Sequence, residues 1–178
     1  MKKICKVLNG FPSSIKSLSK HLAYNPEREV VSVTPSHHDI YLVSFPKSGS
    51  TWLNFIIANI NMLMSGQNRR VTFQNIHQYI PDIHDCRFVN KPFLEWPGLN
   101  IIKSHSLYNR LYPHVIYIVR KLADVLVSYY KFQIGLGNYS GSLSDFIRSE
   151  NGIKNWNKHV IGWFLQSPAS LPFYLIKY

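Results

Sequence analysis

The sequence predicts an α/β fold in which a central parallel sheet is flanked by helices. Apolar segments rich in β-forming residues, at 40–45, 99–105, 115–120 and 171–178, alternate with segments of helical spacing. The first three of these segments end on, or run directly into, polar and charged residues. The carboxyl ends of parallel strands meet along one edge of an open sheet, so we expect a ligand site there.

Length and composition favour a single domain that covers residues 1–178. The chain has 178 residues, of which 46% are hydrophobic, and no break in composition divides it. A chain of this length can bury one substantial core. The formal net charge of +11 suits a polyanionic ligand, although nucleic acid would suit it equally well on charge alone.

The first unit, residues 40–60, reads as a strand, a tight loop and a helix. Gly49 allows a close turn, so the loop amides would point at an anion with the positive end of the helix dipole behind them. Lys47 adds a positive charge, although taken alone it could be an exposed loop lysine. The candidate anion-binding residues are Lys47, Ser48, Gly49, Ser50 and Thr51.

The next two strands end in residues with distinct chemistry. The strand at 99–105 ends at His105, one of 8 histidines, whose type suits proton transfer near neutral pH without a metal. The strand at 115–120 ends at Arg120, and a helix carrying Ser128 follows. A guanidinium offers a fork to phosphate oxygens, and a nearby hydroxyl adds a donor. Alternatively, the arginine is ion-paired and the serine bonds its own backbone.

The last predicted elements are a helix at 152–163 and a strand at 171–178. Trp156, Val160 and Trp163 recur at spacings of four and three, which places them on one helix face against the sheet. We therefore expect this helix to be structural.

The loop at 45–52, Phe-Pro-Lys-Ser-Gly-Ser-Thr-Trp, resembles the 5′-phosphosulfate loop of sulfotransferases that use 3′-phosphoadenylyl sulfate (PAPS), with Ser50 in place of Thr. Its order differs from that of the nucleotide P-loop, where Gly-Lys-Ser/Thr closes a longer glycine-rich turn. Residues 120–132 resemble the family's 3′-phosphate segment, and 103–105 resemble its Lys-Thr-His segment. The segment 121–123, Lys-Leu-Ala, departs from the family's usual Asn-Pro-Lys.

The resemblance implies a three-layer, P-loop-like fold and transfer of a sulfuryl group from PAPS to a hydroxyl or amine. The acceptor would be a small molecule or a glycan. His105 would be the general base, Lys47 would neutralise the charge that builds on the phosphate side as the sulfur leaves, and Lys103 would lie close to the transferred group. PAPS would be bound by Lys47, Ser48, Gly49, Ser50, Thr51, Trp52, Arg120, Ser128 and Tyr178.

Two of these implied contacts concern adenine. Trp52 would stack on the base, although in isolation a tryptophan followed by an apolar helix is more often a core residue. Tyr178 matches an adenine-contacting tyrosine of the family. The family continues beyond this position, so we expect a domain that is incomplete at the C-terminus and leaves apolar surface exposed at its last strand.

Three explanations of that incompleteness stay open: a fragment, a natural short form that binds the cofactor weakly, or completion by a partner chain or a second copy. The alternative function is a catalytically inactive remnant that only binds nucleotide or another anion. A basic nucleic-acid-binding protein is a further alternative, but we expect no nucleic acid ligand. Aromatic residues between 66 and 97 would form either the acceptor pocket or a satellite core; they are Phe73, Tyr79, Phe88, Phe93 and Trp96.

Other classes are disfavoured. Cys5 and Cys86 are too few for a disulfide framework, and the first residues lack the apolar core of a secretory signal, so we expect a cytoplasmic protein. The apolar helix at 52–64 is too short to span a bilayer. Residues of metal-ligand type occur at a spacing that fits no compact site, so we expect no metal; they are His77, Asp82, His84, Asp85 and Cys86.

Overall fold

A computed structural model describes residues 35–67, 69–85 and 100–178 of the chain. Four parallel strands form one sheet in the order β2-β1-β3-β4. The strands are β1 (Asp39–Ser44), β2 (Asn100–Ser104), β3 (His114–Val119) and β4 (Phe173–Lys177). In the centre, Leu42 of β1 lies opposite Lys103 of β2 and Ile116 of β3. The predicted parallel sheet is confirmed. Predictions for Cys5, Cys86, Phe88, Phe93 and Trp96 fall outside the described residues.

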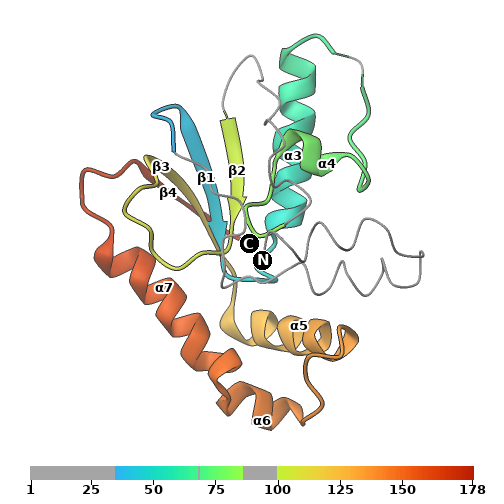
Figure 1. Ribbon diagram of the computed structural model, residues 1–178, viewed down its shortest axis with the longest axis vertical. Coiled ribbons are helices and arrows are strands. Elements are labelled where there is room, and N and C mark those ends of the chain that lie inside the picture. The colour runs from blue at the N-terminus through green and yellow to red at the C-terminus, as the bar shows by residue number, and fades with distance from the viewer. Residues whose placement is uncertain (1–34, 68, 86–99) are drawn as a thin grey trace, which may run out of the picture.

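Helices cover both faces of this sheet, which gives the predicted three layers (Figure 1). The helices are α3 (Ser50–Met64), α4 (Ile76–Tyr79), α5 (Leu122–Gly135), α6 (Leu143–Arg148) and α7 (Asn155–Gln166). Figure 1 shows α3 and α4 on one side, α7 on the other, and α5 and α6 beyond the carboxyl ends of the strands. The carboxyl ends of the strands therefore lie on the same side of the sheet as α5 and α6.

The core follows the two-residue alternation of the strands. On one face, Tyr41 and Tyr117 pack with Trp163 of α7, and none of these three side chains is more than 1% exposed. On the other face, Leu42 and Ile118 pack with α3 and α4. Strands covered on both faces read as nearly continuous apolar runs, which is why the sequence predicted them well.

The last helix differs from its prediction at its start. Gly152 has φ −89° and ψ −126°, outside the helical region, so α7 begins only at Asn155 after a wide turn at Glu150–Lys154. A Cβ atom at Gly152 would collide with the carbonyl oxygens of residues 146 and 147. Trp163 packs on the sheet as predicted, but Trp156 packs instead in the cluster around Phe45 and Phe146, because α7 extends past the strands towards α6 (Figure 1).

The strand β4 lies at an edge of the described sheet and is poorly covered. Tyr174, Leu175 and Ile176 are 66%, 42% and 37% exposed. The expected apolar exposure at the last strand is thus confirmed, while what covers it stays a prediction. Across the described ranges, the helices fall short of the length and apolar character that crossing a membrane requires.

Candidate active site

The loop between β1 and α3 adopts the backbone of an anion-binding turn. Lys47 has φ 68° and Gly49 has φ 103°, both in the left-handed region. The Ser48 amide donates to the Phe45 carbonyl at 3.2 Å, which closes the turn. Gly49 is the N-cap of α3, and within the described residues no side chain caps the first turn and no acidic residue lies in it. Its amides are therefore suited to bind an anion.

Two positively charged side chains, those of Lys47 and Arg120, lie at this loop. An Arg120 Nη1 donates to the Lys47 carbonyl at 3.4 Å, and Lys47 Nζ lies 4.6 Å from the centroid of the Phe132 ring. Desolvation lowers the pKa of Lys47, and the positive charges of Lys103 and Arg120 lower it further. In the part of the chain that the structure describes, neither Lys47 nor Arg120 forms an ion pair. An anion bound here would relieve this mutual repulsion.

Two aromatic rings border the same loop. Tyr178 follows β4, and its amide donates to the Val119 carbonyl at 2.9 Å. Its ring centroid lies 6.0 Å from that of Trp52 and 5.1 Å from the Arg120 guanidinium carbon. Trp52 is 59% exposed, so it is not a core residue. The predicted adenine contacts and the arginine therefore lie together beside Gly49.

The other predicted ligands of the cofactor, Ser50, Thr51 and Ser128, lie on helices. Ser50 is buried and Thr51 exposed in the first turn of α3. Ser128 is partly buried on α5, and no hydrogen bond joins it to Arg120 among the described contacts.

His105 lies directly after β2, next to the end of β1. Its Nδ1 is 2.6 Å from the Ser44 carbonyl oxygen, which can only accept, so Nδ1 carries the proton and the ring's lone pair is on Nε2. Burial holds the pKa of His105 well below its usual value, and the positive charge of Lys103 adds to this effect, while Asp82 opposes it. The ring is neutral near pH 7 and can accept a proton at Nε2.

A buried network of hydrogen bonds holds the backbone of His105 in place. The His105 amide donates to His84 Nε2 at 2.8 Å, and the His84 amide donates to Asp82 Oδ1 at 3.0 Å. Lys103 Nζ donates to Asp82 Oδ2 at 2.7 Å. Burial alone would raise the pKa of Asp82, but Lys103, His105 and His84 together hold it far below its usual value. Lys103 is thus held by a carboxylate that the sequence did not point to as a site residue.

The segment that supplies this network runs alongside β2. Lys103 donates its amide to the Pro81 carbonyl at 2.8 Å and accepts from the Ile83 amide at 3.2 Å. The sequence marks Asp82 and His84 only as residues of metal-ligand type. Among the described residues, no group of three or more His, Cys, Asp or Glu side chains could hold a metal ion. Their arrangement instead orients the backbone and the lysine next to His105.

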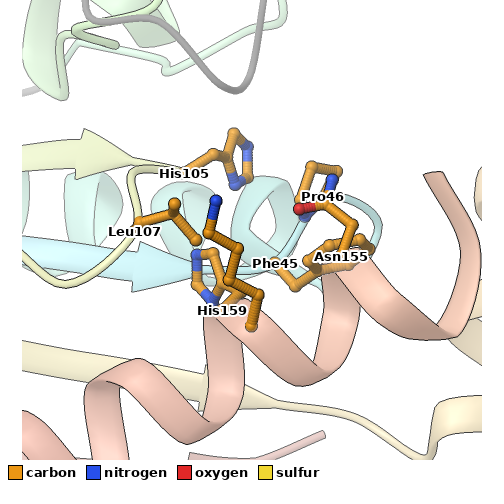
Figure 2. Close-up of a pocket in the computed structure, with 7 residues that line it drawn as sticks. Phe45, Pro46, His105, Leu107, Asn155 and His159 are labelled. Atoms are coloured by element: carbon orange, nitrogen blue, oxygen red, sulfur yellow. The ribbon is translucent and has the colours of Figure 1, made fainter. Parts of the chain in front are cut away.

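A pocket of about 200 Å³ opens beside His105 (Figure 2). It is lined by Phe45, Pro46, His105, Leu107, Asn155, Lys158 and His159. Figure 2 shows His105 and His159 on opposite sides of it. The helix α7, expected to be structural, therefore also supplies a pocket wall. Of the described aromatic residues that would form either the acceptor pocket or a satellite core, Tyr79 is buried in the core beside α3 and Phe73 packs on Phe55, and neither lines this pocket.

Fold and site together define a class: a three-layer α/β protein that presents helix amides, cations and a neutral histidine at the carboxyl edge of a parallel sheet. A family model of the sulfotransferase domain matches residues 37–178, and the chain belongs to that family. This confirms the resemblance read from the motifs, and with it the P-loop-like fold.

Individual relatives agree with this assignment. Sulfotransferase 1E1 of Rattus norvegicus is 31% identical over 166 residues, which cover 83% of this chain and 54% of the relative. Sulfotransferase 2B1 of Mus musculus is 28% identical over 158 residues, covering 79% and 45%. The crystal structure of mouse sulfotransferase SULT7A1 complexed with PAP superimposes with a TM-score of 0.52 at 20% identity, covering 93% of this chain and 57% of the other, and supports the fold. The chain spans about half the length of the curated relatives it matches.

Proposed function

We propose that this protein binds PAPS and transfers its sulfuryl group to the hydroxyl or amine of a small molecule or glycan, with His105 as the general base. The observation that carries the proposal is the hydrogen bond from His105 Nδ1 to the Ser44 carbonyl. It fixes the tautomer that can accept a proton, and it does so at the end of the strand that leads into the anion-binding loop. The proton acceptor and the anion site are therefore held by one strand.

The residues of the loop fit the anionic end of such a donor. The first turn of α3 has no described cap, and Lys47 and Arg120 have no described counter-ion. Lys47 and the amides of residues 48–51 would hold the 5′-phosphosulfate. Arg120 and Ser128 would hold the 3′-phosphate, and Trp52 and Tyr178 would contact the adenine.

When bound, PAPS supplies the sulfuryl group. His105 Nε2 takes the proton from the acceptor as its oxygen or nitrogen bonds to sulfur and the bond from sulfur to the phosphate oxygen breaks. The electron pair leaves with that oxygen, giving adenosine 3′,5′-bisphosphate. Lys47 and the loop amides stabilise the charge that develops there, with Lys103 nearby. The protein thus acts by positioning and by charge neutralisation.

The variant His105→Ala tests the base. We expect sulfuryl transfer to a panel of phenols and amines, followed by mass spectrometry, to fall about 100-fold to 10,000-fold. Binding of adenosine 3′,5′-bisphosphate, followed by calorimetry, should change little, because His105 does not lie in the phosphate loop. His38→Ala, at an exposed histidine before β1, is the matched control. Full turnover by His105→Ala would show that another group takes the proton.

Wild-type protein distinguishes the alternative functions. Binding of the bisphosphate in preference to ATP, without transfer to any acceptor, would indicate a catalytically inactive remnant. Affinity for nucleic acid that falls steeply with salt, with no preference for the bisphosphate, would indicate a nucleic-acid-binding protein. We expect neither.

The proposal also covers the domain organisation, location, metal requirement and assembly of the protein. We propose that residues 1–178 act as one domain in the cytoplasm without a metal, and that a partner chain or a second copy covers β4. The exposure of Tyr174, Leu175 and Ile176 supports the last point. Transfer that survives excess EDTA, and a sedimentation mass that exceeds one chain, are the expected results.

A further inference from the structure

The wall of the pocket opposite His105 is built by α7 and is rich in hydrogen-bond donors. Asn155, Lys158 and His159 line it, while Phe45, Pro46 and Leu107 supply the apolar part of the lining. No carboxylate lines this pocket, and nearby Asp82 is paired with Lys103. A ligand that enters the pocket therefore meets positive charge and N–H groups on the α7 side, His105 on the opposite side, and apolar side chains in the rest of the lining.

The tautomer of His159 is set by a buried tyrosine. The Tyr117 hydroxyl lies 2.8 Å from His159 Nδ1, and Tyr117 is 0% exposed. No other described group bonds to this hydroxyl, so its proton would have no acceptor if Nδ1 carried a hydrogen. The tyrosine therefore donates to Nδ1, and the imidazole proton is on Nε2.

That Nε2–H group is buried without a hydrogen-bond partner among the described residues. Burial lowers the pKa of His159 to about 3, so the ring is neutral at physiological pH and carries a single proton. Hydrogen bonding to the backbone of residues 105 and 106 acts in the opposite direction on this pKa, but at Nε2 these contacts do not reach the distance and angle of a hydrogen bond. Leaving a buried donor unpaired is unfavourable, so a ligand oxygen at this point would be bound strongly.

Lys158 adds a full charge beside this donor. It is exposed, lines the pocket, and forms no ion pair within the described ranges. One ammonium group and one neutral N–H match an anion that has a single charge and two oxygens. A doubly charged group would leave one of its charges without a partner here.

We propose that the acceptor bound in this pocket carries a carboxylate, held by Lys158 and His159, in addition to the hydroxyl or amine that faces His105. The volume of about 200 Å³ suits a single ring between the two groups. The inference rests on the proposed function, because it names the acceptor class of the same site. It makes Lys158 and His159 specificity-determining residues.

Binding of two isosteric phenols to the 178-residue chain tests the proposal. We would titrate 4-hydroxyphenylacetate and its neutral amide, 4-hydroxyphenylacetamide, by calorimetry, with and without adenosine 3′,5′-bisphosphate. The carboxylate should bind about fivefold to tenfold more tightly than the amide, as expected for a charge-assisted hydrogen bond. Equal affinities would overturn the proposal.

Two lysine variants isolate the role of Lys158. Lys158→Met keeps the length of the side chain and should abolish the preference for the carboxylate. Lys154→Met makes the same change in charge four residues away on an exposed lysine that does not line the pocket, and should retain the preference. A loss with both variants would mean a general effect of charge and would overturn the assignment. So would a loss of bisphosphate affinity in Lys158→Met, because Lys158 would then belong to the donor site.

The tautomer is measured without mutation. Long-range ¹H–¹⁵N spectra of histidine-labelled protein should show His159 with its proton on Nε2, and the opposite tautomer would overturn the argument. Failure of the two proposals is distinguishable. Bisphosphate binding without carboxylate preference overturns the acceptor class alone, whereas carboxylate preference without bisphosphate binding or transfer overturns the sulfotransferase function but supports the carboxylate site.

Discussion

The two sides of the candidate site differ in how their charges are balanced. At the loop before α3, Lys47 and Arg120 have no counter-ion among the described residues. Beside His105, Lys103 is paired with Asp82, and the side chains of both are at most 10% exposed. The positive charge at the loop is neutralised only when an anion binds, whereas the charge of Lys103 beside His105 is already neutralised by Asp82.

This difference separates residues that bind the ligand from residues that hold the site in its functional arrangement. Charges without partners at the end of a helix favour an incoming anion and contribute little to folding. A buried, hydrogen-bonded network fixes the position of its members but depends on every one of them. We therefore expect substitutions at the loop to weaken ligand binding and substitutions beside His105 to destabilise the fold.

The largest expected effect is on the buried ion pair. Asp82→Ala leaves the Lys103 ammonium buried without its carboxylate, which should reduce the free energy of unfolding by about 3–5 kcal/mol. Glu150→Ala is the matched control, because Lys154 and Glu150 lie 2.6 Å apart, against 2.7 Å for Lys103 and Asp82, but are 67% and 81% exposed. That exposed pair should contribute less than about 1 kcal/mol. Urea unfolding measures both, and equal losses would contradict the contrast.

The second prediction concerns the loop side. Arg120→Met should weaken binding of adenosine 3′,5′-bisphosphate about tenfold to 100-fold, because a charge-assisted hydrogen bond to phosphate is lost. The free energy of unfolding should change by less than about 1 kcal/mol, since no described counter-ion loses its partner when Arg120 is replaced. Calorimetry and urea unfolding are the measurements, with the exposed Arg148→Met as control. A large loss of stability with unchanged affinity would place Arg120 among the structural residues.

The third prediction is that acid destabilises the histidine side of the site. Burial lowers the pKa of His159 from 6.5 to about 3, so between these values the unfolded chain binds a proton that the folded chain does not. Stability therefore falls as the pH falls through this window. One pKa unit corresponds to about 1.4 kcal/mol, so we expect a loss of about 2 kcal/mol between pH ~6.5 and pH ~4.5.

His105, whose pKa is also lowered by burial, should add to this loss. Asp82 should not contribute above pH ~4, because its pKa is held below its ordinary value and it stays ionised. Urea unfolding at several pH values is the measurement. A His159→Gln variant should show a shallower dependence on pH, and an unchanged slope would contradict the assignment.

The contrast between the two sides also explains what the sequence could predict. The loop side is local: Lys47, Gly49 and Trp52 lie within a few residues, between a strand and a helix whose periodicity is clear. Parallel strands buried on both faces gave equally clear patterns. The sequence alone therefore places these motifs on their elements.

The other side depends on contacts between distant residues. Asp82 and His84 join Lys103 and His105 only because residues 81–83 pair alongside β2, and no motif marks that pairing. His159 reaches the pocket because Gly152 bends the chain before α7 and because Tyr117 of β3 fixes its ring. Neither effect leaves a periodic pattern in the sequence, so the sequence does not predict that α7 forms a wall of the pocket.

The smallest expected effect is at the junction of the loop with the aromatic pair. Gly49 has φ 103°, and an added Cβ atom would lie 2.9 Å from the Tyr178 ring. Gly49→Ala should therefore cost about 1–2 kcal/mol of stability and push Tyr178 away from Trp52. Gly66→Ala separates the two causes, because Gly66 has φ 66° with no atom within 4 Å of the added Cβ, and should cost about 1 kcal/mol through backbone strain alone. The excess at Gly49, measured by urea unfolding together with the change in tryptophan fluorescence, reports the contact with Tyr178. Equal losses in the two variants would mean that the Tyr178 ring does not pack on the loop.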